Sequence, residues 1–257
     1  MTARSRASLL RLALVAGVSG CVAASLAAAA PATQGLSLSW QDCRPPAGSG
    51  FLNQAFGCGS NIVEFPMFPS FSLASPIDSV YAMELVIDVD VASGPNPMPA
   101  WWAMQMPPCS ANGWAADAAP LASCNDAWGG KGTGSFQGWL PGTPGASARH
   151  GRLLVAVSAL PQDAVKLDAA TPYTACRVLL RSANVSSCPD GCMVPACLVF
   201  NSLLIRRFHL PSDQEILVSG GEVPGSDRVT WQGGAGADCA SVPTRRATWG
   251  AVKALYR

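Results

Sequence analysis

Charged residues are scarce in this 257-residue chain: they make up 13% of it, about half of the usual share of roughly 25%. The 17 basic and 16 acidic side chains nearly cancel, which leaves a formal charge of +1. A nucleic-acid-binding protein needs a basic surface, so this balance excludes that class. Histidine is scarcer still, at two residues, so one chain cannot supply a metal site of three histidines. We predict no cofactor and no metal.

Apolar residues, by contrast, make up 49% of the chain, which excludes a disordered protein. The length is sufficient to bury a sizeable core. Glycine and proline together supply 46 residues, and there are ten cysteines. We therefore expect a folded protein with many turns and covalent cross-links, although composition alone identifies no activity.

Residues 1–32 have the pattern of an export signal. Three arginines come first, an uncharged apolar run extends from Leu12 to Ala30, and small residues follow at Ala30–Ala32. We predict cleavage near Ala32, which leaves a single domain over 33–257. In the alternative interpretation, Val18–Cys21 is a bacterial lipobox and Cys21 becomes a lipid-anchored N-terminus.

Removal of the predicted signal takes away three arginines and no acidic residue, so the formal charge falls from +1 to −2. This charge excludes strong attraction to anionic lipid. No later segment is apolar for long enough to span a bilayer, so we predict no transmembrane span in the mature chain. The expected location is secreted or associated with the cell envelope.

Nine cysteines follow the predicted signal, and an oxidising compartment makes disulfides their expected state. We predict two local disulfides, Cys43–Cys58 and Cys109–Cys124, across loops rich in glycine, alanine and proline. A third group combines a tight cluster with one distant cysteine, and its pairing stays open. Its spacing lacks the C-x2-C pair that is usual in zinc sites. The group is Cys188, Cys192, Cys197 and Cys239.

Because nine is odd, one thiol is left over. Cys176 lies in an alternating run with Val178 and Leu180, which is typical of one face of a strand. We predict that Cys176 is a buried, unpaired thiol.

The segment from Ser79 to Ala92 alternates strictly between apolar and mixed residues, which predicts a half-buried antiparallel strand. Its second face carries Glu84, Asp88 and Asp90, and we expect this face to be solvated. Similar shorter runs, separated by proline and glycine, predict further strands. These runs are Leu36–Trp40, Asn61–Phe65, Ala100–Met106, Arg152–Leu160, Tyr173–Arg181, Cys197–Leu210, Glu215–Ser219 and Arg228–Gln232.

Many short strands and little helical periodicity predict an all-β fold: an immunoglobulin-like or jelly-roll antiparallel β-sandwich with disulfide-stapled loops. We interpret the glycine-rich segment Gly129–Ala148 as a loop. The alternative is a linker that divides the chain into two halves near 141–149. A short C-terminal helix is predicted after Thr248, with an apolar side formed by Trp249, Val252, Leu255 and Tyr256.

Two resemblances accompany this pattern. Leu167, Thr171 and Tyr173, followed by Arg177, resemble the tyrosine corner of fibronectin type III and immunoglobulin-like domains, which implies a hydrogen bond from the Tyr173 hydroxyl to the preceding turn. More widely, the layout is similar to an uncharacterised group of exported bacterial β-sandwich proteins that contain cysteine. That group has no assigned activity, so it implies no catalytic residues. The segments that carry the second resemblance are Trp40–Cys43, Pro99–Trp102, Pro195–Asn201 and Thr248–Arg257.

Glu84, Asp88 and Asp90 are the candidate catalytic residues, because carboxylates two residues apart on a strand lie at a separation that glycosidases use. They support the alternative of a secreted polysaccharide hydrolase. The main interpretation is a solvated strand face without catalysis. The two histidines, His150 and His209, are predicted to lie on the surface or in turns.

Tryptophan is the enrichment that suggests binding, because loop tryptophans can stack on sugar rings. We therefore predict a non-enzymatic exported module that binds a polysaccharide or another envelope or extracellular protein, or that has a structural role in the envelope. The alternative for these side chains is packing in the core. The candidate binding residues are Trp101, Trp102, Trp114, Trp128 and Trp139.

Overall fold

The computed structural model describes residues 34–43, 51–59, 63–92, 98–103, 113–143, 147–181, 189–208, 216–218 and 225–239. The described chain is mostly strand, and the all-β prediction is confirmed. Three short helices occur, η1 (Pro161–Asp163), α1 (Pro189–Cys192) and η2 (Gln232–Gly234). The strands are β1 (Gly35–Trp40), β2 (Asn53–Gln54), β3 (Glu64–Ser72), β4 (Ile77–Val91), β5 (Trp114–Asp117), β6 (Gly132–Pro141), β7 (His150–Ala159), β8 (Val165–Leu167), β9 (Tyr173–Thr174), β10 (Arg177–Arg181), β11 (Ala196–Arg207), β12 (Ile216–Val218) and β13 (Arg228–Trp231).

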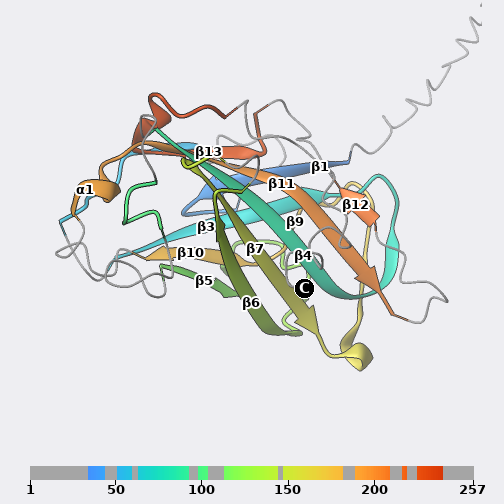
Figure 1. Ribbon diagram of the computed structural model, residues 1–257. Helices are drawn as coiled ribbons and strands as arrows, with labels where there is room; N and C mark the ends of the chain where they lie inside the picture. Colours follow the sequence, from blue (N-terminus) through green and yellow to red (C-terminus); the bar gives the residue numbers. More distant parts are fainter. Residues whose placement is uncertain are drawn as a thin grey trace, which may run out of the picture. The chain divides into compact units, whose positions relative to one another are not determined.

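These strands form two sheets (Figure 1). The smaller sheet has the order β1-β3-β10-β5, with β9 paired to β3. The larger sheet has the order β2-β13-β11-β4-β7-β6, with β12 paired to β11 and β8 paired to β4. Neighbouring strands are antiparallel except for β2 and β13. The long strands β11, β4 and β7 lie side by side and form the centre of the larger sheet.

The predicted apolar face of β4 lies in the core. Met83, Leu85, Ile87 and Val89 are each at most 1% exposed, and they belong to one apolar cluster with residues of the smaller sheet. Burial of each such side chain contributes about 1.5–3 kcal/mol. The alternation in the sequence therefore predicts correctly which face of this strand meets the other sheet.

The outer edge of β1 is closed by residues that lie just before β13 and β2 of the larger sheet. The backbone N–H of Leu38 donates to the carbonyl of Ser226 at 2.8 Å, and the N–H of Trp40 donates to Phe51 at 3.0 Å. The Ser226 hydroxyl donates in turn to the carbonyl of Leu36 at 3.1 Å. Because unpaired edges invite strand addition, these contacts protect this side of the molecule.

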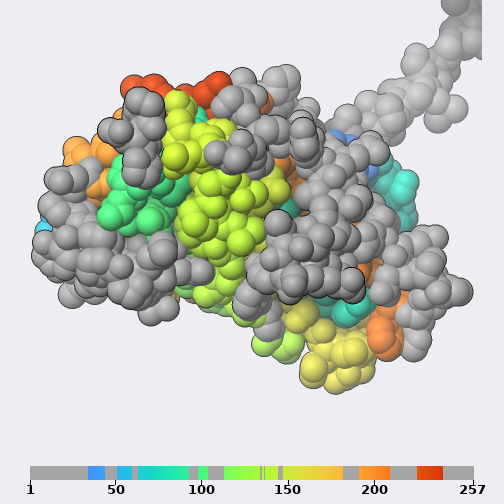
Figure 2. Space-filling view, in the orientation of Figure 1, coloured from blue at the N-terminus to red at the C-terminus, as the bar shows by residue number. Residues whose placement is uncertain are grey.

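On the opposite side, side chains of β6 close the edge of β5. Ser135 Oγ donates to the carbonyl of Ala116 at 2.6 Å, and Gln137 Nε2 reaches the carbonyl of Trp114 at 3.5 Å. Figure 2 shows the segment that carries both strands as one continuous yellow-green surface. Side-chain donors thus take the place of a further strand at this edge.

Gly129–Ala148, predicted to be a loop, contains the whole of β6, and this prediction is wrong. β6 pairs with β7 along its length, so the two strands on either side of 141–149 belong to one sheet. Trp139 packs directly on Gly151, where a Cβ would lie 2.1 Å from the indole ring. This packing and the ladder to β7 outweigh the low strand preference of glycine.

The strand predicted over Ala100–Met106 is also wrong where the structure describes it. Pro99–Ala103 forms a turn in which the carbonyl of Pro99 accepts N–H groups from Trp102 and Ala103, at 2.8 and 3.2 Å. Both Trp101 and Trp102 are buried, instead of one pointing inward and one outward. The turn directs both adjacent rings into the core, whereas the side chains of a strand would alternate between its two faces.

The described residues contain three disulfides, and they correct the predicted local pairs. Cys43 pairs with Cys124, and Cys58 pairs with Cys192, so neither Cys43–Cys58 nor Cys109–Cys124 forms. The third disulfide joins Cys197 to Cys239, as one of the open alternatives allowed. Sequence proximity is a poor guide because the sheet pairings bring distant segments together. The disulfides indicate a non-cytoplasmic environment.

Two local predictions are confirmed. Cys176 is unpaired and buried. The Tyr173 hydroxyl accepts the backbone N–H of Asp168 at 3.0 Å, which is the contact that the tyrosine-corner resemblance implies.

Several predicted features lie outside the described residues: the export signal, Cys21, Cys109, Cys188, His209 and the C-terminal helix. No helix in the described ranges is long and apolar enough to cross a membrane.

Candidate functional site

A row of three ion pairs follows the outer face of β4. Its carboxylates project from alternate positions of the strand, away from the apolar core. Each one meets an arginine from a neighbouring strand or turn at 2.6–2.7 Å. The three ion pairs are Glu84–Arg206, Asp88–Arg152 and Asp90–Arg149.

Asp88 lies at the centre of this row and is fully buried. Arg152 is directly opposite Asp88 in the β4–β7 register, and its Nε and Nη2 donate to the two carboxylate oxygens at 2.6 and 2.9 Å. Asn201 Nδ2 donates to the same carboxylate. The β11–β4 register shifts between Phe200 and Ser202, so Asn201 lies at an irregularity, a feature that often redirects a side chain. Three donors therefore satisfy Asp88 without solvent.

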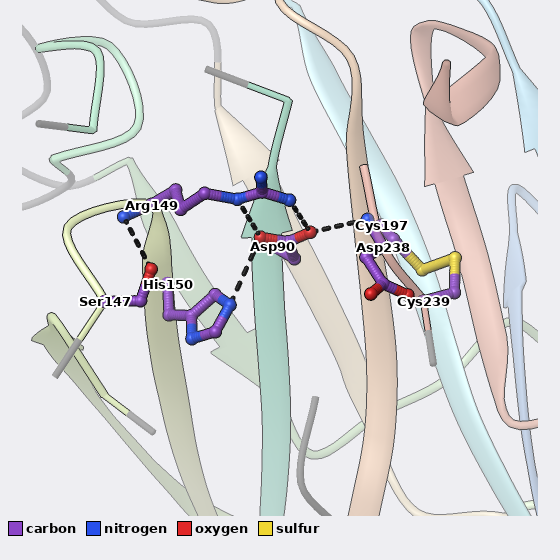
Figure 3. Close-up of polar contacts among 7 residues, drawn as sticks. All are labelled: Asp90, Ser147, Arg149, His150, Cys197, Asp238 and Cys239. Atoms are coloured by element: carbon purple, nitrogen blue, oxygen red, sulfur yellow. Dashed lines mark hydrogen bonds and ion pairs between the residues drawn. A yellow bond between two sulfur atoms is a disulfide. The ribbon is translucent and has the colours of Figure 1, made fainter. Parts of the chain in front are cut away.

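Asp90 joins three separate parts of the chain (Figure 3). Arg149 Nε and Nη2 donate to its two oxygens at 2.8 and 2.6 Å. His150 Nε2 lies 3.3 Å from Oδ1, and the backbone N–H of Asp238 donates to Oδ2 at 2.5 Å. The carboxylate is 0% exposed, whereas the Arg149 side chain is 32% exposed. Solvent therefore reaches the cluster from the arginine side.

The Cys197–Cys239 disulfide lies beside this cluster (Figure 3). Cys197 is directly opposite Asp90 in the β11–β4 register. Ala237 and Cys239 pack against Cys197 and Val199 in a small apolar cluster separate from the core. The segment after β13 thus covers the end of the row of carboxylates.

The contact with Asp90 favours the charged form of Arg149. The side-chain hydrogen bond to Asp90 raises the pKa of the Arg149 guanidinium above its ordinary value, and the attraction of the opposite charge adds to this effect. Removal of one partner would leave the other charge uncompensated, which is costly in a buried site.

The expectation of a solvated strand face is wrong for Asp88 and Asp90. Both are covered, and both use their oxygens in ion pairs and hydrogen bonds. Glu84 lies at the more accessible end of the row, with its side chain 22% exposed. A glycosidase needs a carboxyl group that can reach substrate and exchange a proton, and these contacts oppose that use. The row is suited to holding three strands in register.

All five candidate binding tryptophans are buried, which favours the alternative that they pack in the core. Their exposed fractions range from 0% to 6%. Trp101 and Trp102 pack on Trp231, with ring centroids 5.2 and 5.9 Å away. Trp114 lies against Trp139 at 5.9 Å, and Trp128 Nε1 donates to a backbone carbonyl. Stacking on a sugar needs an exposed ring face, so these rings pack in the core instead.

One group of described residues has the composition of a metal site: Asp42, Cys43 and Cys124. Both sulfurs belong to the disulfide between these cysteines, so neither is available as a thiolate ligand.

The sequence interpretation placed His150 on the surface or in a turn and did not single out Arg149. A usable signal was present. Extension of the alternation in β7 back to residue 150 places His150 and Arg152 on one face, two residues apart. Asp88 and Asp90 have the same spacing on β4, and in an antiparallel pair such matched rows of opposite charge can face each other.

Comparison of the chain with protein-family models, with curated proteins and with solved structures gives no match.

Proposed function

We propose that this protein is an exported, non-enzymatic β-sandwich module that binds a protein partner or has a structural role in the cell envelope. The observation that carries the proposal is the state of Asp88 and Asp90, which are buried and engaged by arginines from another part of the chain. The hydrolase alternative requires free carboxylates, but these contacts occupy the oxygens of Asp88 and Asp90. The same contacts hold β4 against β7.

The covalent framework supports the same role. The disulfides Cys43–Cys124 and Cys58–Cys192 join residues 81 and 134 positions apart. Cross-links of this length stabilise a fold by limiting the unfolded chain, by about 4–5 kcal/mol each in the chain-entropy model. A rigid domain of this kind is useful outside the cytoplasm. The protein is either secreted or held at the membrane by a lipid on Cys21.

The test uses residues 33–257 folded under oxidising conditions. The protein is incubated with cell-envelope protein fractions immobilised on beads, and separately with insoluble peptidoglycan, cellulose and chitin. Depletion from solution is measured, with fully reduced and alkylated protein as the control. Selective retention of the oxidised form by protein fractions supports the proposal. Retention by one polysaccharide accompanied by release of soluble sugar would overturn it in favour of the hydrolase.

A further inference from the structure

After β13, the segment Gln232–Cys239 turns back over the larger sheet. We call this segment the strap. Gln232, Gly233, Gly234 and Gly236 all have positive φ, between 49° and 80°. At Gly234 a Cβ would lie 2.6 Å from Thr230 Cγ2, so the turn requires glycine there. This sharp reversal brings the end of the strap onto the outer face of β11.

Two contacts fasten the end of the strap. One is covalent, the Cys197–Cys239 disulfide. The other is the backbone N–H of Asp238, which donates to the buried Asp90 carboxylate at 2.5 Å. Both anchors, Cys197 and Asp90, are opposite each other in the β11–β4 register, so the strap is clasped at one level of the sheet (Figure 3).

We propose that the Cys197–Cys239 disulfide is a redox-controlled clasp, whose reduction by a dithiol releases the strap while the two sheets stay folded. The step is a balanced exchange. A thiolate of the dithiol attacks Cys239 Sγ, the Cys197–Cys239 bond breaks, and the second thiol closes the reductant into its own disulfide. Two electrons and two protons pass to Cys197 and Cys239, which become thiols.

The length of the loop that it closes distinguishes this disulfide from the other two that the structure describes. It closes 42 residues, against 81 for Cys43–Cys124 and 134 for Cys58–Cys192. The shortest loop contributes least to limiting the unfolded chain, so its loss costs the fold least. Cys239 is partly exposed and Cys197 is fully buried, so a reductant can reach one sulfur of this disulfide. Cys43 and Cys58 are partly exposed as well, so the shorter loop, and not exposure, distinguishes Cys197–Cys239.

Release has a defined structural consequence. The strap covers Cys197 and Val199 on β11 and supplies one of the donors to Asp90. Once the strap leaves, this apolar pair and the Asp90–Arg149 ion pair become accessible together. The clasp thus controls access to a mixed apolar and charged surface, independently of which partner the oxidised protein binds.

The experiment titrates oxidised protein (residues 33–257) with dithiothreitol. Free thiols are alkylated and mapped by mass spectrometry, and hydrogen exchange is followed in the strap and in β4. We expect Cys197 and Cys239 to be alkylated at about tenfold lower dithiothreitol than Cys43, Cys58, Cys124 and Cys192. Exchange of the Ala237–Cys239 amides should then rise by about tenfold or more, with β4 unchanged. Simultaneous reduction of the three disulfides among the described residues, or a strap that stays protected after reduction, would overturn the proposal.

Matched variants separate the clasp from general destabilisation. Cys197→Ser with Cys239→Ser should give fast strap exchange without any reductant. Cys43→Ser with Cys124→Ser, which removes a longer cross-link elsewhere, should leave the strap as protected as in the wild type. If the second variant does not fold, dithiothreitol titration of the wild type supplies the same comparison. Equal strap exchange in the wild type and the Cys197→Ser, Cys239→Ser protein would contradict the clasp.

Discussion

The contribution of the buried carboxylates on β4 to the free energy of unfolding can be measured at the Asp88–Arg152 pair. Asp88 is fully buried and Arg152 is 8% exposed, so each charge depends on the other for compensation. Arg152→Met leaves Asp88 with only the Asn201 donor and should lower the free energy of unfolding by about 3–5 kcal/mol. Asp88→Asn should also destabilise, because it leaves the arginine uncompensated.

The double variant is the informative one. Asp88→Asn combined with Arg152→Met removes both charges, so it should be more stable than Arg152→Met alone. A coupling energy of about 2–3 kcal/mol is expected, measured by urea unfolding at pH 7 as a double-mutant cycle. Lys166→Met is the control, because Lys166 pairs with Asp168 on the surface and such pairs contribute at most about 1 kcal/mol. If the double variant loses the sum of the single losses, the two residues act independently and the reasoning fails.

Three further predictions concern single positions. Gly151→Ala should destabilise by about 1–3 kcal/mol, because its Cβ would collide with the Trp139 ring, and Trp139→Leu should partly rescue it in thermal unfolding. Cys176 should resist alkylation in the native protein, because burial raises the pKa of its thiol; rapid labelling without unfolding would contradict this. The backbone N–H of Ala119 and the Arg177 guanidinium lower the pKa of Asp117 below its ordinary value of 3.8, although burial opposes them. The charged Asp117 carboxylate therefore stabilises the fold fully above pH 3.8, and this contribution disappears as the pH falls through the lowered pKa. Asp117→Asn should reduce the loss of unfolding free energy over that acidic pH range. An unchanged pH dependence would refute the assignment.

Strand periodicity made much of the fold predictable. The alternation from Ser79 to Ala92 identified the buried side chains of β4, and similar runs located β1, β7 and β11 within a few residues. These strands are long and face an apolar core, so their pattern dominates other signals. β6 was missed because its glycines suggest a loop, whereas its pairing with β7 is a tertiary effect that local sequence does not carry.

The candidate site was less predictable, because its chemistry depends on cross-strand neighbours. Asp88 and Asp90 have the sequence pattern of an exposed strand face, and only the register with β7 shows that Arg152 and His150 face them. The disulfides were mispaired for a similar reason: Cys43 and Cys58 are close in sequence, but the sheets bring other partners to each of them. The tryptophans were ambiguous between core and ligand, and packing around Trp231 decides for the core.

The central claim is that the buried carboxylates hold strands together and perform no catalysis. The most direct measurement is the release of soluble reducing sugar from peptidoglycan, cellulose, chitin and envelope polysaccharides by the oxidised wild type and by Asp90→Asn protein. Far-UV circular dichroism checks that both are folded. We predict that neither protein releases sugar above the buffer level, and that Asp90→Asn differs from the wild type by a lower unfolding temperature. Sugar release by the wild type that a folded Asp90→Asn protein lacks would contradict the account.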